Sequence, residues 1–180
     1  VTITEPYSKI FIRDLSSKNK FHSALKIKLP KNLQFKKFSK NLLKEKFDLI
    51  VIALSLSGVD FIGKELKDLK IKTPILVLTK GLKYENKNKK ILTISEQLKK
   101  NYNLINIFVL KGPCLAKELA RKKQTSVVIA SKNIKIAKSI GKQISTKYYI
   151  IEYSKDVVGI EVCSAIKNIY SMIIGAGQSL

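Results

Sequence analysis

The sequence predicts an α/β protein built on a mostly parallel sheet, and three observations lead to this fold class. Short apolar runs rich in β-branched residues alternate with longer stretches of helical periodicity, as in βαβ units. At least six such runs occur, and no internal repeat or low-complexity linker divides them. With 180 residues, of which 45% are hydrophobic, the chain is long enough for one domain with a substantial core.

The expected strands are the apolar runs that end at turn residues. Residues 47–54 read FDLIVIAL, the most apolar run, so we expect this strand to be buried on both faces. Residues 29–33 (LPKNL) are expected to be extended with a turn, because Pro30 disfavours helix at its predecessor. Shorter runs predict the other strands, at residues 9–12, 75–78, 106–110, 126–130 and 148–153.

Helices are expected between these strands, at residues 59–69, 95–101, 114–122 and 133–144. Residues 83–90 are polar, lysine-rich and without periodicity, which predicts a surface loop. The last helix, residues 156–174, has few charges, and its spacing of apolar residues indicates burial on most sides.

The net charge of +22 raises the question of nucleic-acid binding. Only Arg13 and Arg121 among the 35 basic residues are arginines, the residue type that makes bidentate base and phosphate contacts. The lysines are scattered along the chain and form no block. We therefore expect a solvated lysine surface and no specific nucleic-acid partner.

The remaining composition excludes several other classes of site. Cys114 and Cys163 lie far apart, and with His22 as the single histidine we expect no metal site and no disulfide framework. No apolar run reaches about 18 residues, so no membrane insertion is expected. The start lacks the pattern of a signal peptide. It begins at Val1 and not at a methionine, which suggests a missing beginning.

Three segments carry residues suited to chemistry at strand ends, where open α/β sheets bind ligands. Lys80 lies just beyond the apolar run of 75–78, after Thr79, and precedes a glycine. Gly112-Pro113 leads from a strand into a helix, whose free N–H groups suit an anion. Lys167 lies on the apolar last helix, and a buried neutral amine can act as a base. Taken singly, each segment also has an ordinary structural explanation. Lys80 can simply end a strand, Gly112-Pro113 can be an ordinary turn, and Lys167 can extend its ammonium to the surface.

Together the three segments resemble the NAD(P)-dependent glycerol-3-phosphate dehydrogenase family. The matches are Thr-Lys-Gly at 79–81, Gly-Pro-x-x-Ala at 112–116 and Gly-x-Glu-x-x-x-Ala-x-Lys-Asn at 159–168. They are supported by LPKNL, by the strand at 48–54, by TSVVIAS at 125–131 and by DVVGIE at 156–161. The resemblance covers the chain from Lys9 onward.

The resemblance implies a hydride transfer between nicotinamide and C2 of dihydroxyacetone phosphate or glycerol 3-phosphate, in a cytoplasmic enzyme that supplies glycerophospholipid synthesis. Lys167 would be the catalytic acid/base that protonates the C2 oxygen. Asn168, next to it, would hydrogen-bond near the substrate or orient Lys167. Lys80 would contact both substrate and nicotinamide, and its ammonium would favour loss of a proton from the pair. Gly112 and Cys114 would line the substrate side of the turn.

For the cofactor, NAD or NADP, the resemblance implies contacts from Lys80, from Ala116, and from Arg13, which would meet the adenosine ribose and can favour a 2′-phosphate. Residues 1–154 would be a partial Rossmann domain, its sheet truncated at the N-terminus and without its first βα unit. Residues 155–180 would begin an all-α domain. The complete enzyme would be able to form a homodimer, and the 180 residues alone are expected to be inactive.

Departures from the family pattern accompany these matches. Cys114 stands where the family usually has Ser or Thr, and Ser55-Leu56 replaces Pro-Ser after the strand at 48–54. No Gly-x-Gly-x-x-Gly occurs anywhere in the chain. The family's aspartate and Arg-Asn pair for substrate phosphate would follow Leu180.

Three alternatives stay open from the sequence. One is another two-domain Rossmann dehydrogenase with a helix-borne lysine, of the ketopantoate or 6-phosphogluconate type. Another is a basic nucleic-acid-binding module, which would require clustered charges and stacking aromatic residues. The third is the product of a decayed gene, whose sequence retains an enzyme's motifs without its reaction.

Overall fold

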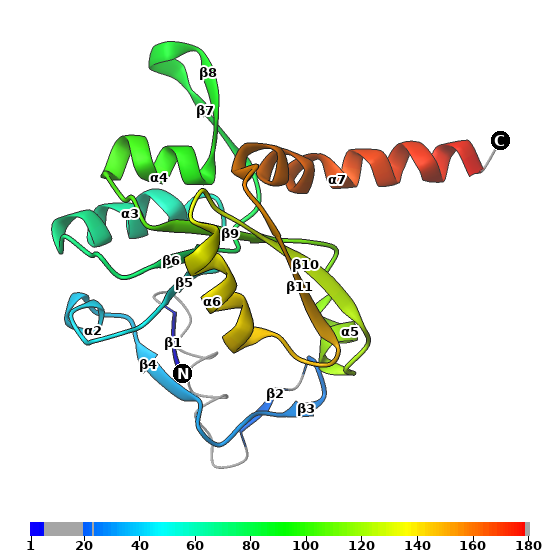
Figure 1. The fold of residues 1–180 in the computed structure, drawn as a ribbon, viewed down its shortest axis with the longest axis horizontal. Coiled ribbons are helices and arrows are strands. Elements are labelled where there is room, and N and C mark those ends of the chain that lie inside the picture. Colours follow the sequence, from blue (N-terminus) through cyan, green and yellow to red (C-terminus); the bar gives the residue numbers. More distant parts are fainter. Residues whose placement is uncertain (6–19, 23, 179–180) are drawn as a thin grey trace. The chain divides into compact units, whose positions relative to one another are not determined.

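The computed structural model describes residues 1–5, 20–22 and 24–178 (Figure 1). These residues form two compact units, one of residues 1–46 and 115–123 and the other of residues 47–114 and 124–178. The strand expected at 9–12 and the candidate residue Arg13 lie outside the described residues. The domain boundary expected at residue 154 stays a prediction.

The larger unit is built on a five-stranded sheet of the order β11-β10-β9-β6-β5 (Figure 1). Three of its four strand pairs are parallel, and β9 and β10 are antiparallel. The prediction of a mostly parallel α/β sheet is therefore confirmed, and its five strands are five of the six that the sequence predicts. They are β5 (Ile50–Ile52), β6 (Ile75–Val77), β9 (Ile107–Lys111), β10 (Thr125–Ala130) and β11 (Tyr149–Ser154).

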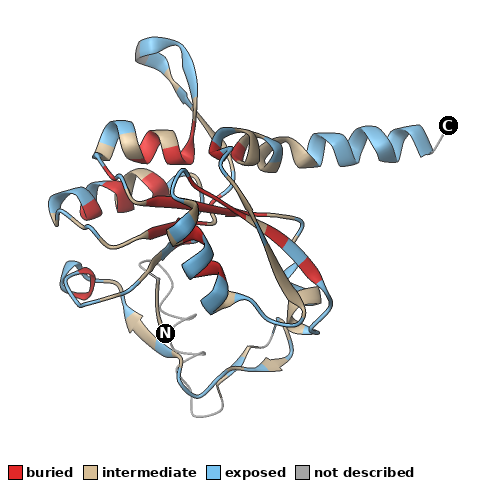
Figure 2. Cartoon of the chain, viewed as in Figure 1, coloured by how far each residue is buried: buried red, intermediate tan, exposed pale blue. Residues whose placement is uncertain are grey.

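Both faces of the central strands are covered, because β6 and β9 are buried along their whole length. One face packs against α6 (Ile134–Ile144), whose buried Ala137 and Ile140 join a cluster with residues of β6, β9 and β10. On the other face, α4 (Ile94–Tyr102) contacts β9 and packs beside α3 (Gly58–Asp68). Figure 2 shows the burial concentrated in these layers. Near-continuous apolar strands are what two covered faces require.

Helices α3, α4 and α6 begin and end near the expected residues. Capping residues explain where α4 and α6 begin. Thr93 and Glu96 form a reciprocal capping box at the start of α4. Asn133 accepts a hydrogen bond from the N–H group of Ile136 and so caps α6. These caps satisfy backbone donors that a helix start leaves without partners.

The prediction of a structureless loop at residues 83–90 is wrong. The chain forms a hairpin of β7 (Leu82–Glu85) and β8 (Lys90–Thr93), joined by a short 3₁₀ turn at Asn86–Asn88. Lys89 ends that turn in the left-handed conformation. The lysines hid the strand pattern, because both faces of this hairpin carry polar residues and Tyr84 and Ile91 are exposed.

The strand predicted at 47–54 is shorter, and burial on both faces is wrong. In the described residues β5 is the edge strand of the sheet, and Val51 is 51% exposed while Ile52 is buried. An edge strand lacks a neighbour on one side, so part of its apolar surface stays uncovered. The helix expected at 114–122 is also shorter, since α5 spans Ala116–Ala120.

The last helix, α7 (Val157–Gln178), is longer than expected, and burial on most sides is wrong. Only Val157 and Glu161 are buried. The first half of the helix contacts β9 and β10, and its second half extends away from the sheet and is exposed (Figures 1 and 2). Exposed apolar residues fill its second half, among them Tyr170, Met172 and Ile173. By length and composition α7 could also cross a membrane, which the expectation from apolar run length missed.

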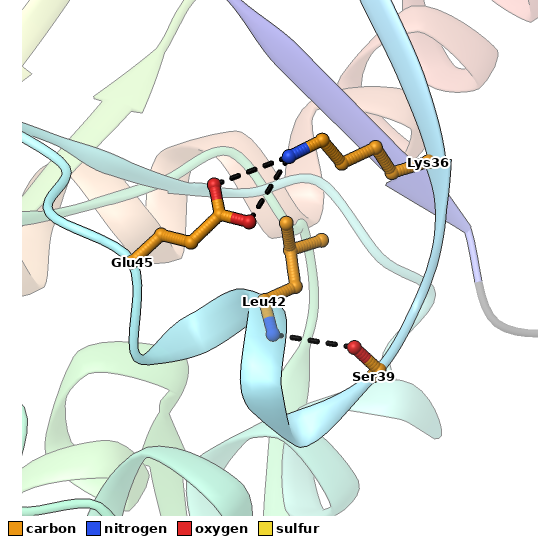
Figure 3. Close-up of polar contacts among 4 residues, drawn as sticks. All are labelled: Lys36, Ser39, Leu42 and Glu45. Atoms are coloured by element: carbon orange, nitrogen blue, oxygen red, sulfur yellow. Dashed lines mark hydrogen bonds and ion pairs between the residues drawn. The ribbon is translucent and has the colours of Figure 1, made fainter.

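The smaller unit contains a parallel pair of β1 (Thr2–Glu5) and β4 (Gln34–Lys37), the hairpin of β2 (Phe21–His22) and β3 (Ile27–Lys28), the short helix α2 (Lys40–Leu43), and α5. Figure 3 shows how α2 is fixed. Ser39 Oγ accepts a hydrogen bond from the N–H group of Leu42 at 3.2 Å. Lys36 Nζ donates to Glu45 Oε1 at 3.0 Å and links β4 to the segment that follows the helix. The turn predicted within residues 29–33 is confirmed, since the N–H group of Leu33 donates to the carbonyl of Pro30 at 3.2 Å.

The carboxylate of Asp60 joins α3 to α4 and to the hairpin. It accepts hydrogen bonds from the hydroxyl of Tyr102 at 2.7 Å, from Nζ of Lys83 at 3.0 Å, and from the side-chain amide of Gln97. Burial alone would raise the pKa of Asp60, but these hydrogen bonds and the Lys83 charge outweigh it and lower the pKa. Burial is the larger cause, and the hydrogen bond to Asp60 the second, that together raise the pKa of Tyr102 to about 12.

Replacing Asp60 by asparagine is expected to lower the midpoint of thermal unfolding at pH 7 by roughly 2–4 °C, or about 1 kcal/mol for a chain of this size. Since the folded-state pKa of Asp60 is lowered, its contribution is complete above its ordinary value of 3.8 and is lost as the pH falls through the folded-state pKa. The deficit of the variant should therefore shrink in acid. Asp68→Asn, on the exposed end of α3, is the control, and an equal loss in both variants would contradict the role of the network.

Candidate functional site

Two lysines from distant parts of the sequence meet at one edge of the sheet. Lys80 follows the end of β6, and Lys167 lies on α7. Partial burial lowers the pKa of Lys80, and repulsion by the charge of Lys167 lowers it further. The structure thus brings together the two lysines that the sequence singled out. An exposed ammonium beside a half-buried one suits an anionic ligand and a proton transfer.

A pocket of about 220 Å³ opens beside Lys167. It is smaller than the roughly 300–1,000 Å³ of most ligand pockets, so it suits a small molecule or one part of a larger one. Gly112 and Lys167, both expected at a site, line it together with Lys111, Pro113, Val128, Ile160, Cys163 and Ser164. The floor of the pocket is the β9–β10 edge and its wall is the first half of α7.

Thr79 holds the backbone from which Lys80 projects. Its hydroxyl Oγ1 donates to the carbonyl of Leu54 at 2.9 Å and accepts from the N–H group of Leu54 at 3.2 Å. The side chain is buried, at 4% exposed. Thr79 therefore joins the carboxyl ends of β5 and β6, the edge at which parallel sheets bind ligands.

Lys111, the last residue of β9, is a site residue that the sequence reasoning missed. It is only 5% exposed, and its Nζ donates to the carbonyls of Val77, at 3.4 Å, and of Thr79. Burial and the charge of Lys80 lower the pKa of Lys111 to about 8, against the opposing charge of Glu161. Its position directly before Gly112-Pro113, at the end of the apolar run 107–110, was the available signal.

Glu161 supplies the negative charge of this region and is also almost fully buried, at 2% exposed. Its carboxylate accepts from the N–H group of Ser95 at 3.2 and 3.3 Å and from the Ser95 hydroxyl. Ser95 lies in the first turn of α4, whose positive dipole end favours a carboxylate. Glu161 thereby fixes the first half of α7, and with it Lys167, against the sheet unit.

Gly112 is required by a close approach of two strands. A Cβ atom at this position would lie 2.9 Å from Cα of Val127 and 3.0 Å from the carbonyl oxygen of Ser126. Only glycine lets β9 end this close to β10 and turn into Pro113. The turn that lines the pocket therefore depends on the absence of a side chain.

The remaining candidates are placed less centrally or in the other unit. Cys114 is partly buried against the core cluster, within electrostatic range of Lys80. Asn168 is exposed, next to Lys167. Ala116 begins α5, which belongs to the smaller unit, and Arg13 lies outside the described residues. The part of the chain that the structure describes holds no cluster of metal-ligating side chains.

Comparison with protein families gives one match that covers most of the chain. Residues 7–137 match the N-terminal domain of NAD-dependent glycerol-3-phosphate dehydrogenase. Among similar proteins, the glycerol-3-phosphate dehydrogenase [NAD(P)+] of Rickettsia conorii is 38% identical over 153 residues, which are 83% of this chain and 45% of that protein. The protein of the same name from Leptospira biflexa is 33% identical over 134 residues, 74% of this chain and 40% of that protein. The chain thus spans less than half the length of these relatives.

Solved structures show the same fold. Glycerol-3-phosphate dehydrogenase from Coxiella burnetii aligns with a TM-score of 0.79 at 22% identity, covering 94% of this chain and 50% of that one. A glycerol-3-phosphate dehydrogenase structure from Dunaliella salina also gives 0.79, at 20% identity, over 94% of this chain and 30% of that one. These alignments confirm the Rossmann type of the sheet.

Replacing Gly112 by alanine is expected to destabilise the protein by about 1–3 kcal/mol, because β9 and β10 must separate to admit the methyl group. Thermal unfolding followed by circular dichroism measures the loss. Gly175→Ala is the matched control, since a Cβ there meets no atom within 4 Å and a helical alanine is favoured over glycine. An unchanged or higher unfolding midpoint for Gly112→Ala would contradict the close approach.

Proposed function

Because the chain belongs to the NAD-dependent glycerol-3-phosphate dehydrogenase family, we propose that it carries the proton-transfer site of an enzyme that interconverts dihydroxyacetone phosphate and glycerol 3-phosphate. The observation that carries this proposal is the meeting of Lys80 and Lys167 beside the pocket. The matching relatives are named for this activity, while this chain covers only part of their length.

Lys167 is the acid/base of the proposed reaction. A ketone at C2 that gains a hydride becomes an alkoxide unless its oxygen receives a proton, and the Lys167 ammonium at the pocket wall provides one. The lysine becomes neutral in this step and is reprotonated from solvent. In the reverse direction the neutral amine accepts the hydroxyl proton. The nearby Lys80 ammonium attracts the anionic substrate.

NAD or NADP would supply or accept the hydride when bound. The described residues fit the nicotinamide end of such a cofactor, since Lys80 and Gly112 lie at the carboxyl edge of β6 and β9. The glycine-rich turn that takes a pyrophosphate does not occur in these 180 residues. We assign Ala116 and Arg13 to the cofactor as part of this proposal, with Gly112, Cys114 and Asn168 on the substrate side.

The exposed half of α7 is part of the same proposal. Residues 155–180 would begin a helical domain whose further helices cover Tyr170, Met172 and Ile173. Since α7 carries the buried Glu161 and the half-buried Lys167 in its first half, we interpret its apolar length as packing within a cytoplasmic protein and not as a membrane span. We further propose a role in glycerophospholipid synthesis and a homodimer for the complete enzyme.

Replacing Lys167 by alanine in the polypeptide as the cell makes it is expected to abolish NADH oxidation with dihydroxyacetone phosphate. The binding of NADH, measured by its fluorescence, should remain, because Lys167 acts on the substrate oxygen. The loss of a positioned acid corresponds to about 10²–10⁴-fold in rate. Lys155→Ala, an exposed lysine just before α7, should keep normal turnover. Substantial turnover in Lys167→Ala would refute the assignment, and an inactive unmodified enzyme would refute the function.

The 180 residues expressed alone are expected to show no turnover with NADH or NADPH, because they contain no glycine-rich turn for the pyrophosphate. A spectrophotometric assay at 340 nm with dihydroxyacetone phosphate tests this. Turnover above that of Lys167→Ala in the same polypeptide would show that the cofactor is held by other residues.

A further inference from the structure

We propose that Lys111 is a positioning residue for Lys80. Its buried ammonium holds the carbonyl groups of Val77 and Thr79, and it thereby fixes the backbone from which Lys80 reaches Lys167. The activity part of this inference rests on the proposed function, whereas the geometric part does not.

The geometry comes from the pairing of β6 with β9. These strands are parallel, with Val77 opposite Val109, so Lys111 lies two residues beyond the end of the pair. From there its side chain runs back under the turn that follows β6 and meets the two carbonyls. Since Nζ of a lysine has three donors and no acceptor, it can serve two carbonyls at once.

The turn needs such an anchor because the residue that follows Lys80 does not restrain the backbone. Gly81 follows with φ of +131°, a conformation that glycine adopts readily and that does not hold Lys80 in place. Restraint on the other side of Lys80 comes from Thr79. Its hydroxyl is tied to Leu54, and its carbonyl is tied to Lys111. Thr79 is thus held at both its side chain and its backbone.

Burying the Lys111 ammonium costs free energy that an apolar side chain in the same space would not cost. An isolated buried charge is destabilising, and the charge of Lys80 adds repulsion. The opposing charge of Glu161 and the two carbonyls offset that cost. A neutral apolar residue would fill the same space between β6 and β9, so the lysine is best explained by what its hydrogen bonds hold.

The test is a double-mutant cycle read at Lys80 itself. Trace labelling with acetic anhydride at a series of pH values, followed by mass spectrometry of peptides, gives the titration of Lys80 in the natural full chain. The cycle measures how much Lys167→Ala shifts the Lys80 titration in two backgrounds. The first background keeps Lys111, and the second carries Lys111→Met. If Lys111 positions Lys80, Lys167→Ala raises the Lys80 midpoint in the first background and leaves it nearly unchanged in the second.

Turnover provides the second readout. Lys111→Met should lower kcat by about 10- to 100-fold with little change in KM for NADH, since the misplacement affects the reacting groups. Lys111→Arg, which keeps charge and donors, should recover part of this loss and part of the coupling. Lys135→Met, which removes an exposed lysine from α6, should behave as the unmodified protein in both readouts.

Each outcome decides the inference. Equal effects of Lys167→Ala in both backgrounds would overturn it, because Lys80 would then keep its place without Lys111. If Lys111→Met does not fold by circular dichroism, Lys111→Gln replaces it, since the shorter neutral amide cannot span to both carbonyls and should lose the coupling as well. If Lys111→Met loses the coupling but the unmodified protein has no dehydrogenase activity, the positioning role is supported and the proposed function is refuted.

Discussion

The structure of this site depends on placing three ammonium groups at one sheet edge. Lys80, Lys111 and Lys167 come from two strand ends and a helix, and like charges in such proximity repel. Three features make the arrangement tolerable: Lys80 stays exposed, Lys111 is bonded to carbonyls, and Glu161 adds a buried negative charge. The repulsion that remains is useful, because it eases the loss of a proton from a lysine and attracts an anion.

The sheet brings these groups together through strand direction. β5, β6 and β9 are parallel, so their carboxyl ends, and the residues that follow them, meet at one edge. β10 then runs antiparallel to β9, and the absence of a side chain at Gly112 allows their close approach beside the pocket. The ligand side of the unit is therefore set by topology, and the chemistry by the few residues that occupy the strand ends.

The elements that sequence alone predicted are those whose signal is local. β6, β9, β10 and β11 are runs of β-branched and apolar residues, and α4 and α6 have capping residues in sequence. Lys80 and Lys167 are indicated by their places after an apolar run and on an apolar helix, and the motif resemblance implies their roles. Lys111 was missed because its burial arises from β6 and Glu161, which are distant in sequence, and the exposure of α7 because an apolar helix has the same composition whether or not it is covered.

Helix α7 connects two environments that act on the same lysine. Its first turns are fixed by Glu161 on the start of α4, and its later turns are exposed and apolar. Lys167 and Tyr170 are one turn apart, and a helix transmits displacement along its axis as a rigid element. A displacement of the later turns would therefore also move the Lys167 ammonium relative to Lys80. The sheet fixes Lys80, whereas the position of Lys167 depends on how α7 is held, through Glu161 at its start.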